Sequence, residues 1–153
     1  MKFDELGLLG LIVNMGLRSF IHRLTAPAYS TGEGPAGPMK LACVVNQELK
    51  MGKGKIAAQV GHASVKAILD LGKSNPAALE AYLSKGQKKI CLKVPTSQDL
   101  KSLQQECKEA GVPCSAIHDA GHTQIPAGSF TVLAIGPAED DVIDSVVSHL
   151  KLL

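Results

Sequence analysis

The sequence predicts a single α/β domain in which a mixed four-stranded sheet is flanked by helices on both faces. The chain has 153 residues, the usual size of one domain. Strand-like and helix-like segments alternate in the order β-α-α-β-α-β-β-α, as in layered α/β folds. The tight connection from Ile117 to Phe130 suits a loop between neighbouring strands, which makes the sheet mixed.

The composition indicates a domain with an aliphatic core. Apolar residues make up 45% of the chain and charged residues 20%. Aromatic residues make up only 3%, with no Trp, so no platform is visible on which single-stranded nucleic acid could stack. The four cysteines lack the CxxC spacing of metal and redox sites and are expected to be small hydrophobes in a reducing compartment.

Residues 1–24 stand apart from this domain. Their apolar residues recur at helical spacing, which favours a targeting or anchoring helix. The apolar run Leu6–Val13 is too short to span a bilayer, which needs about 20 residues. Asp4 and Glu5 count against a mitochondrial presequence, and a poorly ordered extension or a leader is an equal alternative. Residues 25–38 are rich in Gly and Pro, so we expect a linker there and the folded domain in residues 39–153.

The first half of the domain is expected to form a strand and two helices. Leu41–Val45 is a short apolar run, typical of a buried strand. Lys55–Leu71 has helical spacing and many small residues, which let a helix approach a sheet closely. Pro76 can occupy the first turn of a shorter helix that ends near Ser84.

The second half alternates in the same way. Lys89–Val94 is the second predicted strand, and Thr96 or Ser97 can cap a helix that ends at Gly111. Cys114–Ile117 and Phe130–Ile135 are the third and fourth predicted strands, the last one ended by Gly136 and Pro137. Asp140–His149 is amphipathic and predicts the final helix.

A candidate anion site lies between the first strand and the first helix. Gly52 and Gly54 allow backbone geometries that other residues avoid, and Lys50, Lys53 and Lys55 bring positive charge to the amino end of the helix. The Walker A spacing is absent. The Gly52-x-Gly54 pattern imitates a dinucleotide fingerprint, but the second strand supplies no acid for a ribose. A glycine-rich helix start with solvated lysines remains the alternative.

A second candidate site follows the third strand. Asp119 lies where a strand end exposes its side chain, and its carboxylate can orient water or hold a lysine. Thr123 and Gln124 can donate hydrogen bonds, and the alternative is an Asx-type turn. The histidines of this loop match no zinc signature, so no metal is expected. His62 lies two turns after Lys55 on one helix face, either as a proton carrier or as a packed residue.

The net charge of +2 conceals an uneven distribution. Lysines cluster in residues 40–66 and again at Lys85, Lys88, Lys89 and Lys93, whereas acids gather in residues 139–144. This asymmetry suits a face that binds phosphates, although charge alone favours a solvated lysine surface.

Three segments resemble the type 2 peptidyl-tRNA hydrolases of archaea and eukaryotes. They are KLACVVNQELKMGKGKIAAQVGHASV, HDAGHTQIPAGSFTVLAIGP and DSVVSHLKLL, and the resemblance runs from Met39 to Leu153. It implies a mixed four-stranded sheet, a homodimer, and cleavage of the ester between a peptide and tRNA without a metal or organic cofactor. The chain departs from the family pattern at Asn46, where a basic residue is usual, and at His122, where Lys or Arg is usual.

The resemblance also implies roles for particular residues. Lys55, Asp119 and Thr123 take the catalytic positions, with His62 as a proton carrier. Lys55 and Asp119 must then meet at one edge of the sheet, although they are far apart in sequence. Substrate contacts are expected from Lys50, Gly52, Lys53, Gly54, Lys88, Lys89, His122 and Gln124.

The resulting hypothesis is a peptidyl-tRNA hydrolase of the cytoplasm, or of the mitochondrion if residues 1–24 direct it there. The alternative is a non-catalytic interaction module of the same fold, anchored at a mitochondrial membrane through residues 1–24. Weak membrane association through that segment is compatible with either hypothesis.

Overall fold

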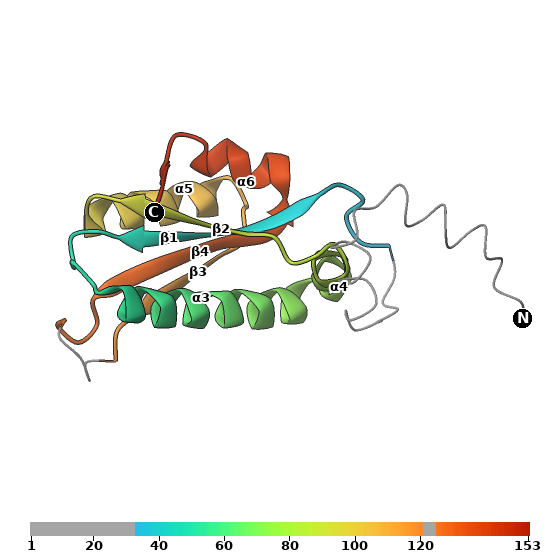
Figure 1. Cartoon of the computed structure of the whole chain (residues 1–153). Coiled ribbons are helices and arrows are strands. Elements are labelled where there is room, and N and C mark those ends of the chain that lie inside the picture. Colours follow the sequence, from blue (N-terminus) through green and yellow to red (C-terminus); the bar gives the residue numbers. More distant parts are fainter. Residues whose placement is uncertain (1–32, 121–124) are drawn as a thin grey trace, which may run out of the picture.

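The sheet has five strands in the order β3-β4-β1-β2-β5, in a computed structural model that describes residues 33–120 and 125–153 (Figure 1). β1 and β2 are parallel, and the other neighbouring pairs are antiparallel, so the predicted mixed α/β sheet is confirmed. The strands are β1 (Met39–Asn46), β2 (Lys89–Val94), β3 (Cys114–His118), β4 (Phe130–Glu139) and β5 (Lys151–Leu152).

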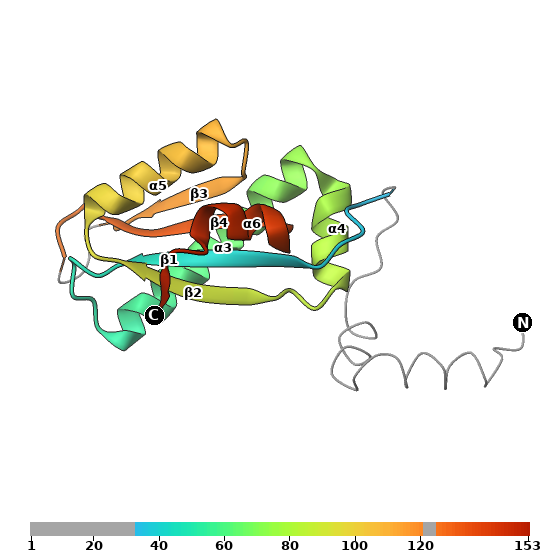
Figure 2. The ribbon, with the colours of Figure 1, turned by 90° about the horizontal axis from the view of Figure 1, so that it is seen from above.

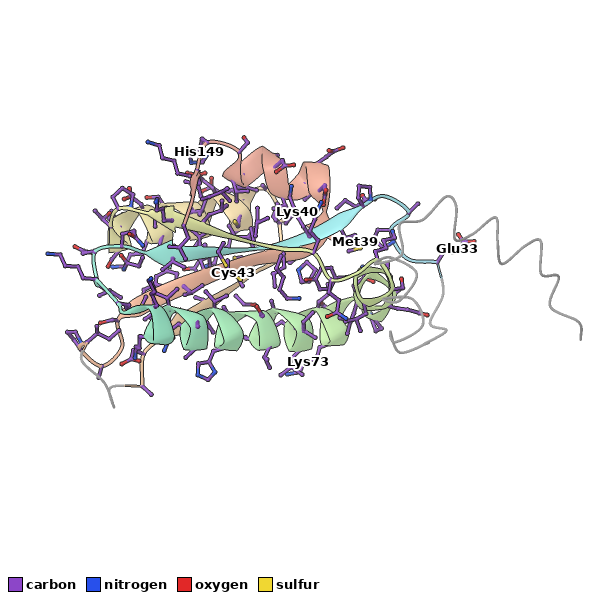
Figure 3. All side chains as sticks on the ribbon, in the orientation of Figure 1. Glu33, Met39, Lys40, Cys43, Lys73 and His149 are labelled. Atoms are coloured by element: carbon purple, nitrogen blue, oxygen red, sulfur yellow. The ribbon has the colours of Figure 1, made fainter. Side chains whose placement is uncertain are left out.

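Two helices cover each face of the sheet, as predicted. α3 (Lys53–Ser74) and α4 (Pro76–Ser84) lie on one face, and α5 (Ser97–Glu109) and α6 (Asp140–Val147) on the other (Figures 1 and 2). Lys73 on α3 and His149 after α6 accordingly project from opposite sides of the molecule (Figure 3).

The central strand β1 separates two hydrophobic cores. Leu41, Cys43 and Val45 pack against α3 and α4, whereas Ala42 and Val44 pack against α5 and α6. Successive side chains of a strand point to opposite faces, so a strand buried on both faces must be continuously apolar. Figure 3 shows Cys43 between the sheet and α3.

Two helix starts follow from capping residues in the sequence. α4 begins at Pro76, and the Asn75 side chain accepts a hydrogen bond from Ala78 N at 3.0 Å. For α5 the cap is Thr96, which forms a capping box with Asp99. The sequence predicted either Thr96 or Ser97 as the cap of this helix, and Thr96 is the residue that caps it.

Two strand predictions need correction. β4 does not end before Gly136 but continues to Glu139, because its register against β1 shifts there and the ladder resumes at Ala138. Gly136 has φ +95°, which favours glycine, and Pro137 falls at the irregularity, where its missing N–H costs no ladder hydrogen bond. The count of four strands was also too low, because Lys151–Leu152 forms β5 along the edge of β2. Two exposed residues carry too little pattern to predict a strand.

The chain before β1 is tied to the end of the sheet opposite the β3–β4 loop. Lys85 Nζ donates to the carbonyls of Pro35 and Gly37, and Asp140 N donates to Pro38 O at 2.8 Å. The segment 1–24 and most of the expected linker lie outside the described residues. In the part of the chain that is described, no helix is long and apolar enough to cross a membrane.

Candidate active site

Lys55 and Asp119 form an ion pair at the edge of the sheet where α3 begins and the β3–β4 loop leaves β3 (left in Figure 1). The sequence places Lys55 in the first turn of α3, after the N-cap Gly52, and Asp119 directly after β3. The Lys55 side chain is 18% exposed and that of Asp119 5%, so solvent screens their attraction little. The expected meeting of these two residues is thus observed.

The backbone of Asp119 is fixed by the returning chain. Asp119 N donates to Ser129 O at 2.9 Å, and Gly128 N donates to Asp119 O at 2.8 Å. Gly128 has φ +80°, a conformation that favours glycine. The carboxylate consequently faces α3, where Lys55 Nζ and Gln59 Nε2 donate to its Oδ1.

Two buried polar residues support Asp119 and were not predicted. Gln59 Nε2 lies 3.4 Å from Asp119 Oδ1, and Thr131 Oγ1 lies 2.8 Å from Gln59 Oε1. Gln59 is 7% exposed and Thr131 is fully buried. Gln59 could have been found, because it lies four residues after Lys55 on one helix face. Thr131 gave no signal, because its position depends on an irregularity in β4.

An open hollow of about 550 Å³ lies beside the ion pair, within the size range of small-ligand sites. His62 is exposed and lines this hollow, so the structure brings it to the same site as Lys55 and Asp119. His118 also lines the hollow and packs against the Phe130 ring, with ring centroids 4.9 Å apart. The lining residues are Lys55, Ala58, Gln59, His62, Ala116, Ile117, His118, Asp119 and Ala120.

Asn46 joins three segments at the same sheet edge. It is 1% exposed, and its Nδ2 donates to Ser97 Oγ at 2.8 Å and to Phe130 O at 2.9 Å. Its Oδ1 accepts a hydrogen bond from Glu48 N at 3.0 Å. Ser97 in turn donates to the Glu48 carboxylate, and these hydrogen bonds lower the pKa of Glu48. Asn46 is therefore a structural residue here and offers no charge to a substrate.

The lysines expected to contact substrate lie in two places. Lys50 and Lys53 are exposed beside the ion pair, at the turn before α3 and at its first residue. Lys88 and Lys89 lie toward the other end of β2, and the six residues from Lys89 to Val94 span roughly 17 Å.

Those two distant lysines already have partners. Lys88 forms an ion pair with Asp140, and Lys89 Nζ lies 5.4 Å from the centre of the Tyr82 ring. Burial lowers the pKa of Lys89. The structure does not bring Lys88 and Lys89 to the site, whereas Gly52 and Gly54 belong to it as the exposed start of α3.

The remaining predicted residues, His122, Thr123 and Gln124, lie outside the described residues. Within residues 33–120 and 125–153, no three His, Cys, Asp or Glu side chains converge as metal ligands do. All four cysteines are described, and none forms a disulfide.

Comparisons with known proteins agree over the folded domain. The sequence model of the family described as "Peptidyl-tRNA hydrolase PTH2" matches residues 39–153. The peptidyl-tRNA hydrolase of Methanocaldococcus jannaschii is 46% identical over 115 residues, which cover 75% of this chain and 100% of that protein. The human protein "Peptidyl-tRNA hydrolase 2, mitochondrial" is 46% identical over 119 residues, covering 78% of this chain and 66% of that protein.

A solved structure shares the fold alone. It is that of a protein of unknown function from Agrobacterium, with a TM-score of 0.53 and 11% sequence identity. The similarity covers 76% of this chain and 98% of the other.

Proposed function

The chain belongs to the peptidyl-tRNA hydrolase PTH2 family, and we propose that the Lys55–Asp119 pair carries the chemistry of that family. The protein is thus a hydrolase that cleaves the ester between the peptide and tRNA of peptidyl-tRNA, releasing both for reuse. The ion pair at the edge of an open hollow is the observation that carries the site assignment.

Ester hydrolysis needs an attacking water, stabilisation of the oxyanion, and a proton for the leaving ribose oxygen. Asp119 accepts a proton from the water while the water oxygen attacks the ester carbonyl carbon. Lys55 and the N–H groups of the first turn of α3 stabilise the negative charge that develops on the carbonyl oxygen, because a helix start carries partial positive charge. The carbon–oxygen bond to the ribose then breaks, and the ribose oxygen leaves with a proton. His62 lines the hollow and can carry that proton. Thr123, which lies outside the described residues, is assigned the role of holding the water or Asp119 on the family resemblance alone.

The non-catalytic interaction module is the weaker alternative. It gives no reason for a lysine and an aspartate from distant segments to be paired beside a hollow of about 550 Å³. Buried ion pairs are costly to form and are weak evidence for stability, so a functional role accounts better for this one.

Substrate binding is assigned to the basic start of α3. Lys50 and Lys53 are exposed at the start of α3 and would meet phosphates near the acceptor end of tRNA, with Gly52 and Gly54 allowing the backbone to approach closely. His122 and Gln124 would contact the substrate from the loop after Asp119. Lys88 and Lys89 would contact tRNA only at a second position along the molecule, since they lie at the far end of β2.

Hydrolysis of an N-acetylated aminoacyl-tRNA tests the proposed function. We expect the wild-type protein to release free tRNA in the presence of EDTA. We also expect KM to rise steeply with salt, because counterions compete for the tRNA phosphates. No release of tRNA at any salt concentration, with substrate binding intact, would favour the interaction module instead.

We further propose that the protein forms a homodimer through the outer face of α3. Gly61, Val65 and Leu69 recur every four residues and form an exposed stripe, with Val65 61% and Leu69 58% exposed. Gly61 at one end of the stripe lets a second helix approach closely. Lys66 and Asp70 pair with each other at 3.0 Å beside the stripe and leave its apolar centre uncharged. A second copy of this helix is the occupant that matches an apolar stripe of this length.

Residues 1–24 are proposed to direct the protein to mitochondria, either as a targeting segment or through weak membrane association. The family model matches residues 39–153, so this segment lies outside the matched residues. A fluorescent fusion of the full chain should reach mitochondria, whereas residues 39–153 alone should remain in the cytoplasm. The same distribution for both fusions would contradict this role.

A further inference from the structure

We infer that Thr131 and Gln59 form a relay that positions Asp119 for catalysis, an inference that rests on the proposed function. Thr131 is fully buried and Gln59 is 7% exposed, and buried polar groups of this kind require hydrogen-bond partners. Their partners form one chain, from Thr131 Oγ1 to Gln59 Oε1 at 2.8 Å and from Gln59 Nε2 to Asp119 Oδ1 at 3.4 Å. The relay ends on the oxygen that Lys55 also contacts.

A bulge in β4 delivers Thr131 to this position. β3 and β4 pair Ile117 with Val132 but His118 with Phe130, so the pairing skips Thr131. Val132 packs on the α3 side of the sheet and Phe130 on the α5 side. Thr131 bonds to Gln59 of α3, so two consecutive residues face the same layer, which an unbroken strand does not allow. Bulges often redirect a side chain beside an active site.

The hydroxyl of Thr131 supports the orientation of the Gln59 amide that presents its NH₂ to Asp119. A carboxylate only accepts hydrogen bonds, so it requires the amide NH₂ on its side. The hydroxyl carries one proton and has two acceptors, Gln59 Oε1 at 2.8 Å and Ile117 O at 3.1 Å. When it donates to Gln59 Oε1, it holds the NH₂ toward Asp119. The reversed amide would place two acceptor oxygens against each other.

The relay therefore favours the carboxylate form of Asp119, the form that accepts a proton from water. The other described charged or titratable groups at this site are Lys55 and His62 on α3 and His118, which precedes Asp119 on β3. Among the described residues of β4, the one that reaches this site is Thr131, which carries no charge. Without the hydroxyl, Gln59 Oε1 loses the donor that holds the NH₂ toward Asp119. A reversed amide, whose oxygen can accept a proton from neutral Asp119, then becomes relatively more favourable. Activity should then require a higher pH. Thr131 and Gln59 act through Asp119 and are positioning residues.

The test compares Thr131→Val, Thr131→Ser and Gln59→Met in steady-state hydrolysis of N-acetylated aminoacyl-tRNA across pH. We expect Thr131→Val, which keeps the shape but removes the hydroxyl, to lower kcat on the order of tenfold with KM nearly unchanged. Its acid limb should move to higher pH, and Thr131→Ser should restore the wild-type profile. Gln59→Met should reproduce the Thr131→Val profile, which keeps the test decisive if Thr131→Val does not fold.

Wild type and Asp119→Asn are measured alongside these variants. An active wild type, an inactive Asp119→Asn and unchanged pH profiles in Thr131→Val and Gln59→Met would overturn the relay alone. Equal losses in Thr131→Ser and Thr131→Val would also overturn it, since packing would then explain both. An inactive wild type, or an Asp119→Asn variant as active as wild type, would overturn the proposed function and the relay with it.

Discussion

Asp119→Asn is expected to lower kcat for peptidyl-tRNA hydrolysis by about 10²- to 10⁴-fold, the range over which a positioned general base contributes. The amide keeps the shape of the side chain but cannot take a proton from water. Lys55→Met should lower kcat by about 10²- to 10³-fold, because it removes the charge that stabilises the oxyanion. The measurement is steady-state release of tRNA from an N-acetylated aminoacyl-tRNA, together with thermal unfolding of each variant.

A second lysine–aspartate pair provides the matched control. Lys40 and Asp144 lie 2.6 Å apart near the opposite end of β1, with the Lys40 side chain 9% exposed. Asp144→Asn and Lys40→Met should leave kcat within about twofold of wild type, since a pair this far from the chemistry acts mainly on stability. A loss of activity in these controls as large as that at Asp119 would mean that the assay reports folding.

Leu69→Glu is expected to convert the proposed homodimer into a monomer. The substitution places a carboxylate at the Leu69 end of the apolar α3 stripe, and the two-fold symmetry of a dimer brings a second copy of that charge into the same interface. Juxtaposed like charges at an interface cost several kcal/mol, so dissociation should become at least about 100-fold easier. Light scattering at micromolar concentration should then report half the wild-type mass.

Val142→Glu is the control for this substitution. Val142 is also an exposed hydrophobic residue, 39% exposed, but it lies on α6 across the sheet from α3. The Val142→Glu variant should keep the wild-type mass. A wild-type protein that is already monomeric, or a Leu69→Glu variant that remains a dimer, would contradict an interface on α3.

The fold could be predicted from the sequence because its elements carry clear periodicities. β1 is apolar from Leu41 to Val45 because it is buried on both faces, and α3 has its buried side chains at Gln59, Ala63, Ala67 and Leu71. The two corrections come from features without such a pattern. β5 has only two exposed residues, and β4 passes Gly136 and Pro137 through a register shift set by its pairing with β1.

The candidate site was predictable only in part for the same physical reason. Lys55 and Asp119 each lie at the boundary of an element, so the layered α/β arrangement brings them to one edge. Thr131 depends on a bulge, which is a property of strand pairing and leaves no mark in a single sequence. Lys88 and Lys89 were expected at the site because lysines cluster there in the sequence. The cluster instead lies at the far end of β2, since neighbours along the chain need not lie near the site.

The double variant Lys55→Met/Asp119→Asn tests the central claim most directly, because two residues that act as one catalytic unit have strongly non-additive effects. The single-turnover rate of ester cleavage, with enzyme in excess over peptidyl-tRNA, is the quantity to measure for wild type, both single variants and the double variant. We expect the double variant to be within about threefold of the slower single variant. Losses that multiply, or cleavage at the wild-type rate in any of the three variants, would contradict a shared role for Lys55 and Asp119.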